Sequence, residues 1–146
     1  METKEFKITI DAPKEKVWNT LWNDATYPEW TSVFASGSRA ESDWKKGSKI
    51  LFLDGKGSGM VSVIAEKIPN EFMSFKHLGE VKDGVEDTTS DKVSQWSGAF
   101  ENYTLKTKEG KTELIVDLDI SDDFADYFLQ TFPKALDKVK EIAEKN

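Results

Sequence analysis

The stretch IDAPKEKVWNTLW, residues 10–22, carries the chain from a strand into a helix. Residues 3–10, which lead into it, alternate apolar and polar side chains, as a half-buried strand does. Pro13 suits the first position of a helix, because its missing N–H would have no partner there. Four apolar residues then recur at helical spacing: Val17, Trp18, Leu21 and Trp22. This pattern predicts an amphipathic helix over 13–23.

After this helix the pattern changes to short strands. Asn23 and Asp24 favour the start of a second short helix, which is expected to end near Pro28. From Arg39 to Ile120, apolar runs alternate with turn residues, which is typical of strands. The predicted strands span residues 39–44, 49–54, 60–68, 72–78, 95–107 and 112–120, with a polar loop over 79–94.

The last part of the chain is expected to form one long helix over 122–145. Its apolar residues recur every three or four positions: Phe124, Phe128, Phe132, Leu136, Val139 and Ile142. Ser121 is a suitable N-cap, and Pro133 predicts a kink near 129–133. The whole pattern indicates an α+β fold, and 146 residues is the size of a single domain, 1–146.

The composition excludes several classes of protein. An excess of 27 acidic over 20 basic residues gives a net charge of −7, so we expect no nucleic-acid partner. Without cysteine there is no disulfide, thiolate metal site or cysteine nucleophile. The single histidine, His77, excludes a site with two histidine ligands from one chain, and we expect no metal and no cofactor.

The sequence also shows no pattern typical of a membrane-spanning helix or a signal peptide. No apolar run approaches the about 20 residues that a membrane-spanning helix needs, so we expect no membrane insertion. Residues 1–7 lack the apolar core of a signal peptide. The expected location is therefore cytoplasmic.

One segment resembles a known chemical motif, and one residue is a candidate acid–base group. The segment DGKGSG, residues 54–59, looks like a phosphate-binding loop, but a strand pattern follows it instead of a helix, so we interpret it as a hairpin. No nucleophile elbow surrounds any serine, and His77 is the only imidazole available as an acid–base group. Neither the DGKGSG segment nor His77 identifies a reaction.

Strand alternation brings three polar residues to one face. In 72–78 it turns His77 inward, and in 95–107 it turns Glu101 and Tyr103 inward. The three side chains are expected to form a polar cluster inside an apolar cup. Such a cluster either orients a ligand or is a satisfied buried polar group, and a register break would instead leave Glu101 in solvent, so all three interpretations stay open.

The order of strand, two short helices, six strands and long helix resembles that of the START-like helix-grip (SRPBCC) superfamily. The matching residues are Ile10-Asp11-Ala12-Pro13-x-x-x-Val17-Trp18 leading into Trp30, the Gly47 turn, Ile68-Pro69-Asn70-Glu71, and Tyr103-Thr-Leu105 followed by Gly110-Lys-Thr-Glu-Leu114. The closest branch that it resembles is the bacterial family named for similarity to the activator of the ninety-kilodalton heat-shock protein ATPase. The resemblance implies a curved antiparallel sheet of about seven strands wrapped around the C-terminal helix, with a cavity between them. Relatives bind lipids, hormones or polyketides there, and a few are cyclases.

We therefore expect the protein to bind an apolar or aromatic small molecule, lipid-like or polyketide-like, in that cavity, and we expect no catalysis. The expected lining combines aromatic rings with a few polar groups: Trp30, Phe34, Phe52, Phe75, His77, Trp96, Glu101, Tyr103, Phe128 and Phe132. Two alternatives stay open. One is an enzyme of the cyclase or hydrolase type that uses His77 as its acid–base group. The other is a chaperone-associated protein that acts through its surface.

Overall fold

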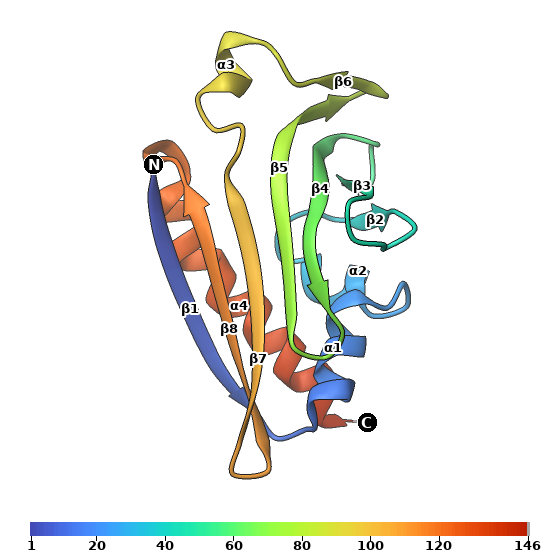
Figure 1. Cartoon of the computed structure of the whole chain (residues 1–146), viewed down its shortest axis with the longest axis vertical. Helices are drawn as coiled ribbons and strands as arrows, with labels where there is room; N and C mark the ends of the chain where they lie inside the picture. The colour runs from blue at the N-terminus through green and yellow to red at the C-terminus, as the bar shows by residue number, and fades with distance from the viewer. Residues whose placement is uncertain (146) are drawn as a thin grey trace.

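An antiparallel sheet of eight strands curves around the C-terminal helix in the computed structural model, which describes residues 1–145 (Figure 1). The strands are β1 (Glu2–Ile10), β2 (Arg39–Glu41), β3 (Lys49–Leu53), β4 (Gly59–Ile68), β5 (Phe72–Lys82), β6 (Val85–Asp87), β7 (Phe100–Lys108) and β8 (Lys111–Ile120). Their order in the sheet is β1-β8-β7-β5-β4-β3-β2, and β6 pairs with β5. The α+β architecture with a long C-terminal helix is therefore confirmed, with eight strands where about seven were expected.

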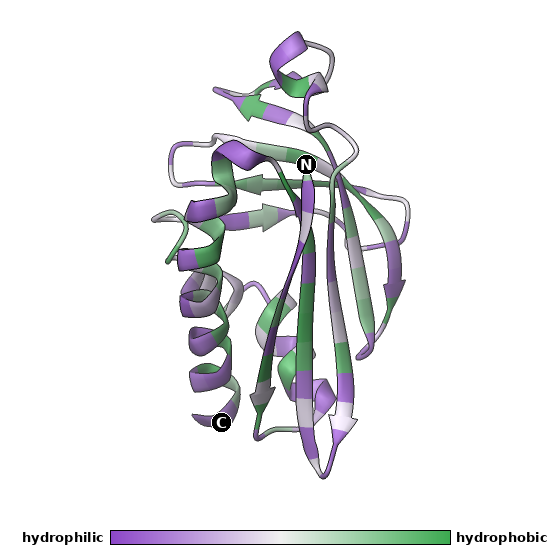
Figure 2. Ribbon diagram, turned by 90° about the vertical axis from the view of Figure 1, so that its left-hand side faces the viewer, coloured by the Kyte–Doolittle hydropathy of each residue, from purple (hydrophilic) through white to green (hydrophobic). Residues whose placement is uncertain are grey.

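Four helices complete the fold. They are α1 (Lys14–Trp22), α2 (Tyr27–Thr31), α3 (Asp91–Ser94) and α4 (Ala125–Lys145), and a 3-10 turn over Asp122–Phe124 precedes α4. Figure 2 shows α4 along one face of the sheet, with α1 and α2 beside it. This layering leaves the other face of the sheet to solvent, which explains the strict alternation of buried and partly exposed residues along β8.

The core lies between α4 and the concave face of the sheet. The buried residues of α4 are Phe132, Ala135, Leu136, Val139 and Ala143. Phe132 stacks on Phe6 of β1, with ring centroids 5.2 Å apart. Helix α4 continues through Pro133, which is exposed and lies within the helix.

The predicted second helix was misplaced. Residues 24–26 form a turn, and α2 begins at Tyr27 and continues to Thr31. Pro28 therefore lies in the first turn of α2, where a proline costs no hydrogen bond, and does not end a helix there. Tyr27 and Trp30 therefore belong to the same short helix, and both are buried.

The predicted polar loop over 79–94 is wrong. Strand β5 continues to Lys82 because Val81 is buried beside Leu53 and Val61. Asp83 and Gly84 both adopt positive φ, which makes a tight hairpin turn into β6. Ser90 then caps α3 by accepting the backbone N–H of Val93. Short elements therefore order most of this segment.

The predicted strand over 95–107 begins five residues later, at Phe100. The segment before it turns instead, because Gly98 has a φ of +94°. Its backbone still reaches β5: Gly98 N–H donates to the carbonyl of His77, and His77 N–H donates to that of Ala99, both at 2.8 Å. These two bonds fix the backbone of His77 at the edge of the cavity described next.

Candidate ligand-binding site

A cavity of about 330 Å³ lies between the sheet, α2 and the first turns of α4. Nine of its nineteen lining residues carry aromatic rings: Trp22, Tyr27, Trp30, Phe34, Phe52, Tyr103, Tyr127, Phe128 and Phe132. They come from α1, α2, the segment after α2, β3, β7 and α4. The volume falls at the lower end of the range for small-molecule sites, and an apolar wall with a few polar groups is typical of them.

A chain of four polar side chains crosses three neighbouring strands on the sheet side of this cavity. Ser62 Oγ on β4 lies 2.6 Å from Nδ1 of His77 on β5. Nε2 of His77 lies 3.0 Å from Oε1 of Glu101 on β7. The Tyr103 hydroxyl donates to the other oxygen of that carboxylate, Oε2. His77, Glu101 and Tyr103 all line the cavity, whereas Ser62 does not.

The sheet register explains this chain. Ser62 and His77 are cross-strand partners, and Phe75 pairs with Glu101, so the adjacent strands place these groups within reach of one another. Glu101 and Tyr103 are two residues apart on one strand and therefore share a face. The polar cluster expected from strand alternation thus forms, with Ser62 as a fourth member.

The cluster holds a carboxylate at the cavity wall. Burial acts to raise the pKa of Glu101, but the hydrogen bond and electrostatic attraction of His77 and the Tyr103 hydroxyl outweigh it and lower that pKa. Burial, followed by the nearby Glu101 charge, raises the pKa of Tyr103 well above its usual value. The same two causes raise the pKa of Tyr27. At neutral pH the cavity therefore holds an ionised Glu101 among neutral phenols.

A second cavity of about 320 Å³ lies on the other side of this cluster. It shares five lining residues with the first: Gly59, Met60, His77, Glu101 and Phe128. Trp96, Leu118 and Phe124 are among the apolar residues that line only the second cavity. The ring of Phe128 and the carboxylate of Glu101 therefore lie where the two spaces adjoin.

The family model for activator of Hsp90 ATPase homolog 1-like proteins matches residues 11–144. This chain belongs to that family. The match covers the sheet and most of the C-terminal helix, between which the first cavity lies. A comparison with curated proteins found no match.

Solved structures show the same fold at low sequence identity. The Aha1 dimer from Colwellia psychrerythraea superposes with a TM-score of 0.76 at 20% identity, covering 99% of this chain and 97% of that one. A protein from Mesorhizobium loti gives 0.74 at 14% identity, covering 99% and 98%. CalU16 from Micromonospora echinospora gives 0.69 at 14% identity, covering 97% and 75%. These similarities establish the helix-grip fold and leave the ligand open.

Eight of the ten predicted site residues line the first cavity: Trp30, Phe34, Phe52, His77, Glu101, Tyr103, Phe128 and Phe132. Trp96 lines the second cavity only. Phe75 lines neither, because it is fully buried behind the wall, where its ring packs edge-on against Phe52 at 5.0 Å. Its place is structural, since it supports a lining ring.

Sequence reasoning missed several lining residues, most clearly Trp22, Tyr27, Met60 and Tyr127. Tyr27 was assigned to the end of a helix, and its inward direction follows from the true start of α2. Tyr127 sits one position before Phe128, off the apolar stripe of α4, and its hydroxyl donates to the carbonyl of Phe34. Only the aromatic character of Trp22 and Tyr27 could have signalled them.

Two absences hold for residues 1–145. No helix in that range is both long and apolar enough to cross a bilayer. In the same range, no three His, Asp or Glu side chains come together as a metal site would require.

The raised pKa of Tyr103 makes a prediction about stability in alkali. A tyrosine ionises at a pH of about 10 in the unfolded chain, so the folded state binds more protons above that pH and its stability falls as the pH rises. Tyr103→Phe removes this contribution and should flatten the decline. Urea denaturation between pH 8 and about 11 measures it, with Tyr127→Phe, whose residue is 44% exposed, as control. An unchanged slope in Tyr103→Phe would contradict the assignment.

Proposed function

We propose that the protein binds an apolar or aromatic small molecule, lipid-like or polyketide-like, in the first cavity and releases it unchanged. The observation that carries this proposal is an aromatic cavity of about 330 Å³ in which His77, Glu101 and Tyr103 lie together on the wall formed by the sheet. Rings supply contact area and stacking, while the Glu101 cluster supplies direction. The family's helix-grip fold is consistent with such a role.

The same cluster argues against catalysis by His77. Its two ring nitrogens already face Ser62 and Glu101, which leaves neither free for a substrate. Ser62 has no exposed surface and cannot meet a substrate as a nucleophile. The arrangement therefore supports holding a ligand better than transforming one.

A role through the surface, as a chaperone-associated protein, is supported less well. The large apolar residues exposed at the start of α4 are Phe124, Tyr127 and Leu129. Phe124 and Tyr127 line the second and the first cavity respectively, so their exposure belongs to the cavity rims. Only Leu129 of these three remains for a partner surface.

Replacing Phe128 by a larger or by a smaller side chain tests the binding proposal. The uncharged fluorescent probe N-phenyl-1-naphthylamine should bind the folded protein and quench Trp22 and Trp30, which line the cavity. Phe128→Trp fills space and should weaken binding about tenfold, equivalent to about 1.4 kcal/mol. Phe128→Ala opens the wall shared by both cavities and should shift preference toward larger probes. Fluorescence titration measures both.

Leu129→Ala is the matched control, because Leu129 is 45% exposed and lines neither cavity. It should bind the probe as the parent does. Absence of probe binding to the folded parent would refute the proposal. Equal loss of binding in Phe128→Trp and Leu129→Ala would place the probe on the surface of α4 instead of inside.

A further inference from the structure

The charge of the cavity walls selects among ligands of the proposed kind. Among residues 1–145, no lysine or arginine lines either of the two adjoining cavities, whereas Asp54, Glu80, Glu101 and Asp119 do. A ligand with a carboxylate or phosphate would therefore enter a space that has acids, no lysine or arginine, and one imidazole, His77, that is already paired with Glu101. Burying such an anion without a partner is strongly unfavourable.

Most of these acids are already engaged. Lys92 pairs with Glu80 at 3.2 Å. Asp119 accepts the Thr3 hydroxyl at 2.7 Å and the Phe100 N–H at 2.9 Å. Lys92 therefore neutralises Glu80, whereas Asp119 accepts one bond on each oxygen but lines only the second cavity, away from the aromatic wall of the first.

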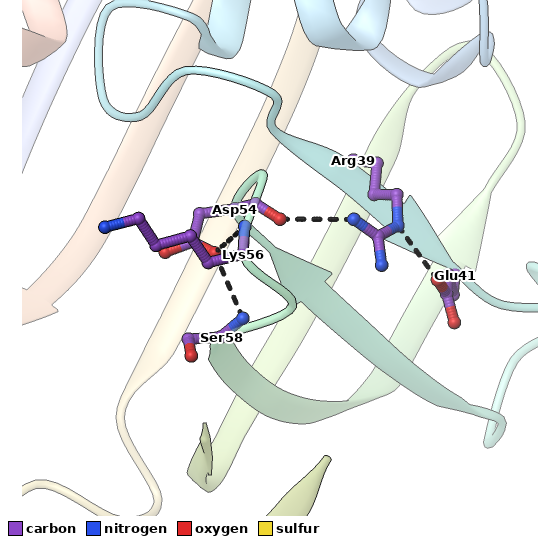
Figure 3. A network of polar contacts seen from close by, with 5 residues as sticks. All are labelled: Arg39, Glu41, Asp54, Lys56 and Ser58. Carbon is purple, nitrogen blue, oxygen red and sulfur yellow. Dashed lines mark hydrogen bonds and ion pairs between the residues drawn. The ribbon is translucent and has the colours of Figure 1, made fainter. Parts of the chain in front are cut away.

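Asp54 is engaged as well, as Figure 3 shows. One of its carboxylate oxygens accepts the backbone N–H groups of Lys56 and Ser58, at 2.8 and 3.0 Å. Arg39, the only arginine of the chain, donates to the Asp54 carbonyl at 3.1 Å and pairs with Glu41 at 3.0 Å. Arg39 is thus held outside the lining and offers no anchor for an anion.

Glu101 remains as the acid that faces both cavities. Each of its oxygens accepts one hydrogen bond, from His77 Nε2 and from the Tyr103 hydroxyl. A carboxylate oxygen has room for about two such bonds, so each can accept one more donor. The side chain is 23% exposed, which gives a ligand access to it.

The aromatic wall suits the same kind of ligand. Trp22, Tyr27, Trp30 and Tyr103 line the space beside Glu101, and the π-faces of such rings attract cations. Rings together with a carboxylate are a combination that receives an ammonium group. The net charge of −7 also favours the approach of a cation over that of an anion.

We infer that the cavity takes an organic amine, cationic at neutral pH and carried on an aromatic or apolar body, with its ammonium group donating to Glu101. The inference rests on the proposed binding function and names its ligand class. It places fatty acids and other carboxylates among the poorest ligands. The positive charge is held by a charge-assisted hydrogen bond, which is stronger than one between neutral groups.

Three probes that share one ring system test this inference: 1-naphthylmethylamine, 1-naphthalenemethanol and 1-naphthoate, which are cationic, neutral and anionic at pH 7. Calorimetry or Trp fluorescence gives each dissociation constant. The amine should bind at least about tenfold more tightly than the acid, with the alcohol between them. Glu101→Gln should reduce the amine to the affinity of the alcohol.

Asp126→Asn is the matched control, since it removes the same charge from an exposed acid of α4 that lines neither cavity. It should keep the preference for the amine. Tyr103→Phe is the second variant and tests the inference if Glu101→Gln fails to fold: it keeps the ring and the carboxylate but removes one donor to Glu101, so the preference for the amine should increase, and a loss of that preference would overturn the inference.

The possible outcomes separate the two proposals. Similar affinities for all three probes, or tighter binding of the acid, would overturn the inference and leave the binding function standing. Loss of the amine preference in Asp126→Asn would assign it to overall charge and not to Glu101, which also overturns the inference. If none of the three probes binds the folded protein, the binding function itself fails.

Discussion

Trp22→Ala should lower the free energy of unfolding by about 3–5 kcal/mol, the cost of removing a large buried ring. Trp22 is 8% exposed and lies at the centre of the aromatic cluster. Its ring centroid lies 4.8 Å from that of Tyr103 and 5.3 Å from that of Phe75, both edge-on, and 5.9 Å from that of Trp44. Removing the ring leaves several partners without contacts at once. Thermal or urea denaturation measures the loss.

Replacement of the same residue by phenylalanine separates packing from hydrogen bonding. Within residues 1–145, the buried Nε1 of Trp22 has no hydrogen-bond acceptor, so Trp22→Phe loses no such bond. Trp30 differs, because its Nε1 donates to the carbonyl of Leu21 at 3.0 Å. Trp30→Phe should therefore cost about 1 kcal/mol more than Trp22→Phe. Equal losses in the two phenylalanine variants would show that the Trp30 bond contributes nothing net.

Local sequence patterns correctly predicted the strands and helices that bury only one of their faces. The alternation along β8 and the stripe of α4 each have one buried side, so periodicity located both. The same reasoning placed His77, Glu101 and Tyr103 on one face, although alternation along β5 is incomplete, since Ser74 is buried as well. The hairpin at Asp83-Gly84 was also present as a turn signal, but the acidic residues around it favoured a loop.

Features that depend on the register between paired strands could not be predicted from alternation along one strand. Ser62 meets His77 because a bulge between Val61 and Ser62 shifts the pairing of β4 with β5. Val61 and Ser62 are neighbours in the sequence and are both buried, which breaks the alternation that would have revealed Ser62 as an inward-facing residue. Whether the rings fill the cup or leave a cavity likewise depends on how α2 and α4 pack, which no local pattern contains.

Gly59→Ala should destabilise the protein by about 3 kcal/mol, at the upper end for adding one methyl group to a packed site. A Cβ at Gly59 would lie 1.7 Å from the carbonyl oxygen of Phe52 and 2.8 Å from its carbonyl carbon. Both are backbone atoms of β3, so no side-chain rotation relieves the clash. The paired strands must move apart where Gly59 faces Leu53.

Gly55→Ala on the same hairpin is the matched control. Its Cβ would lie 3.1 Å from the carbonyl oxygen of Ser36, which a shift of a few tenths of an ångström relieves. We expect a loss of about 1 kcal/mol or less, because the smaller entropy of the unfolded chain offsets part of the strain. Urea denaturation of both variants measures the difference, and equal stability would contradict the prediction. Since Phe52 and Gly59 both line the first cavity, Gly59→Ala should also weaken binding of N-phenyl-1-naphthylamine, whereas Gly55→Ala should not.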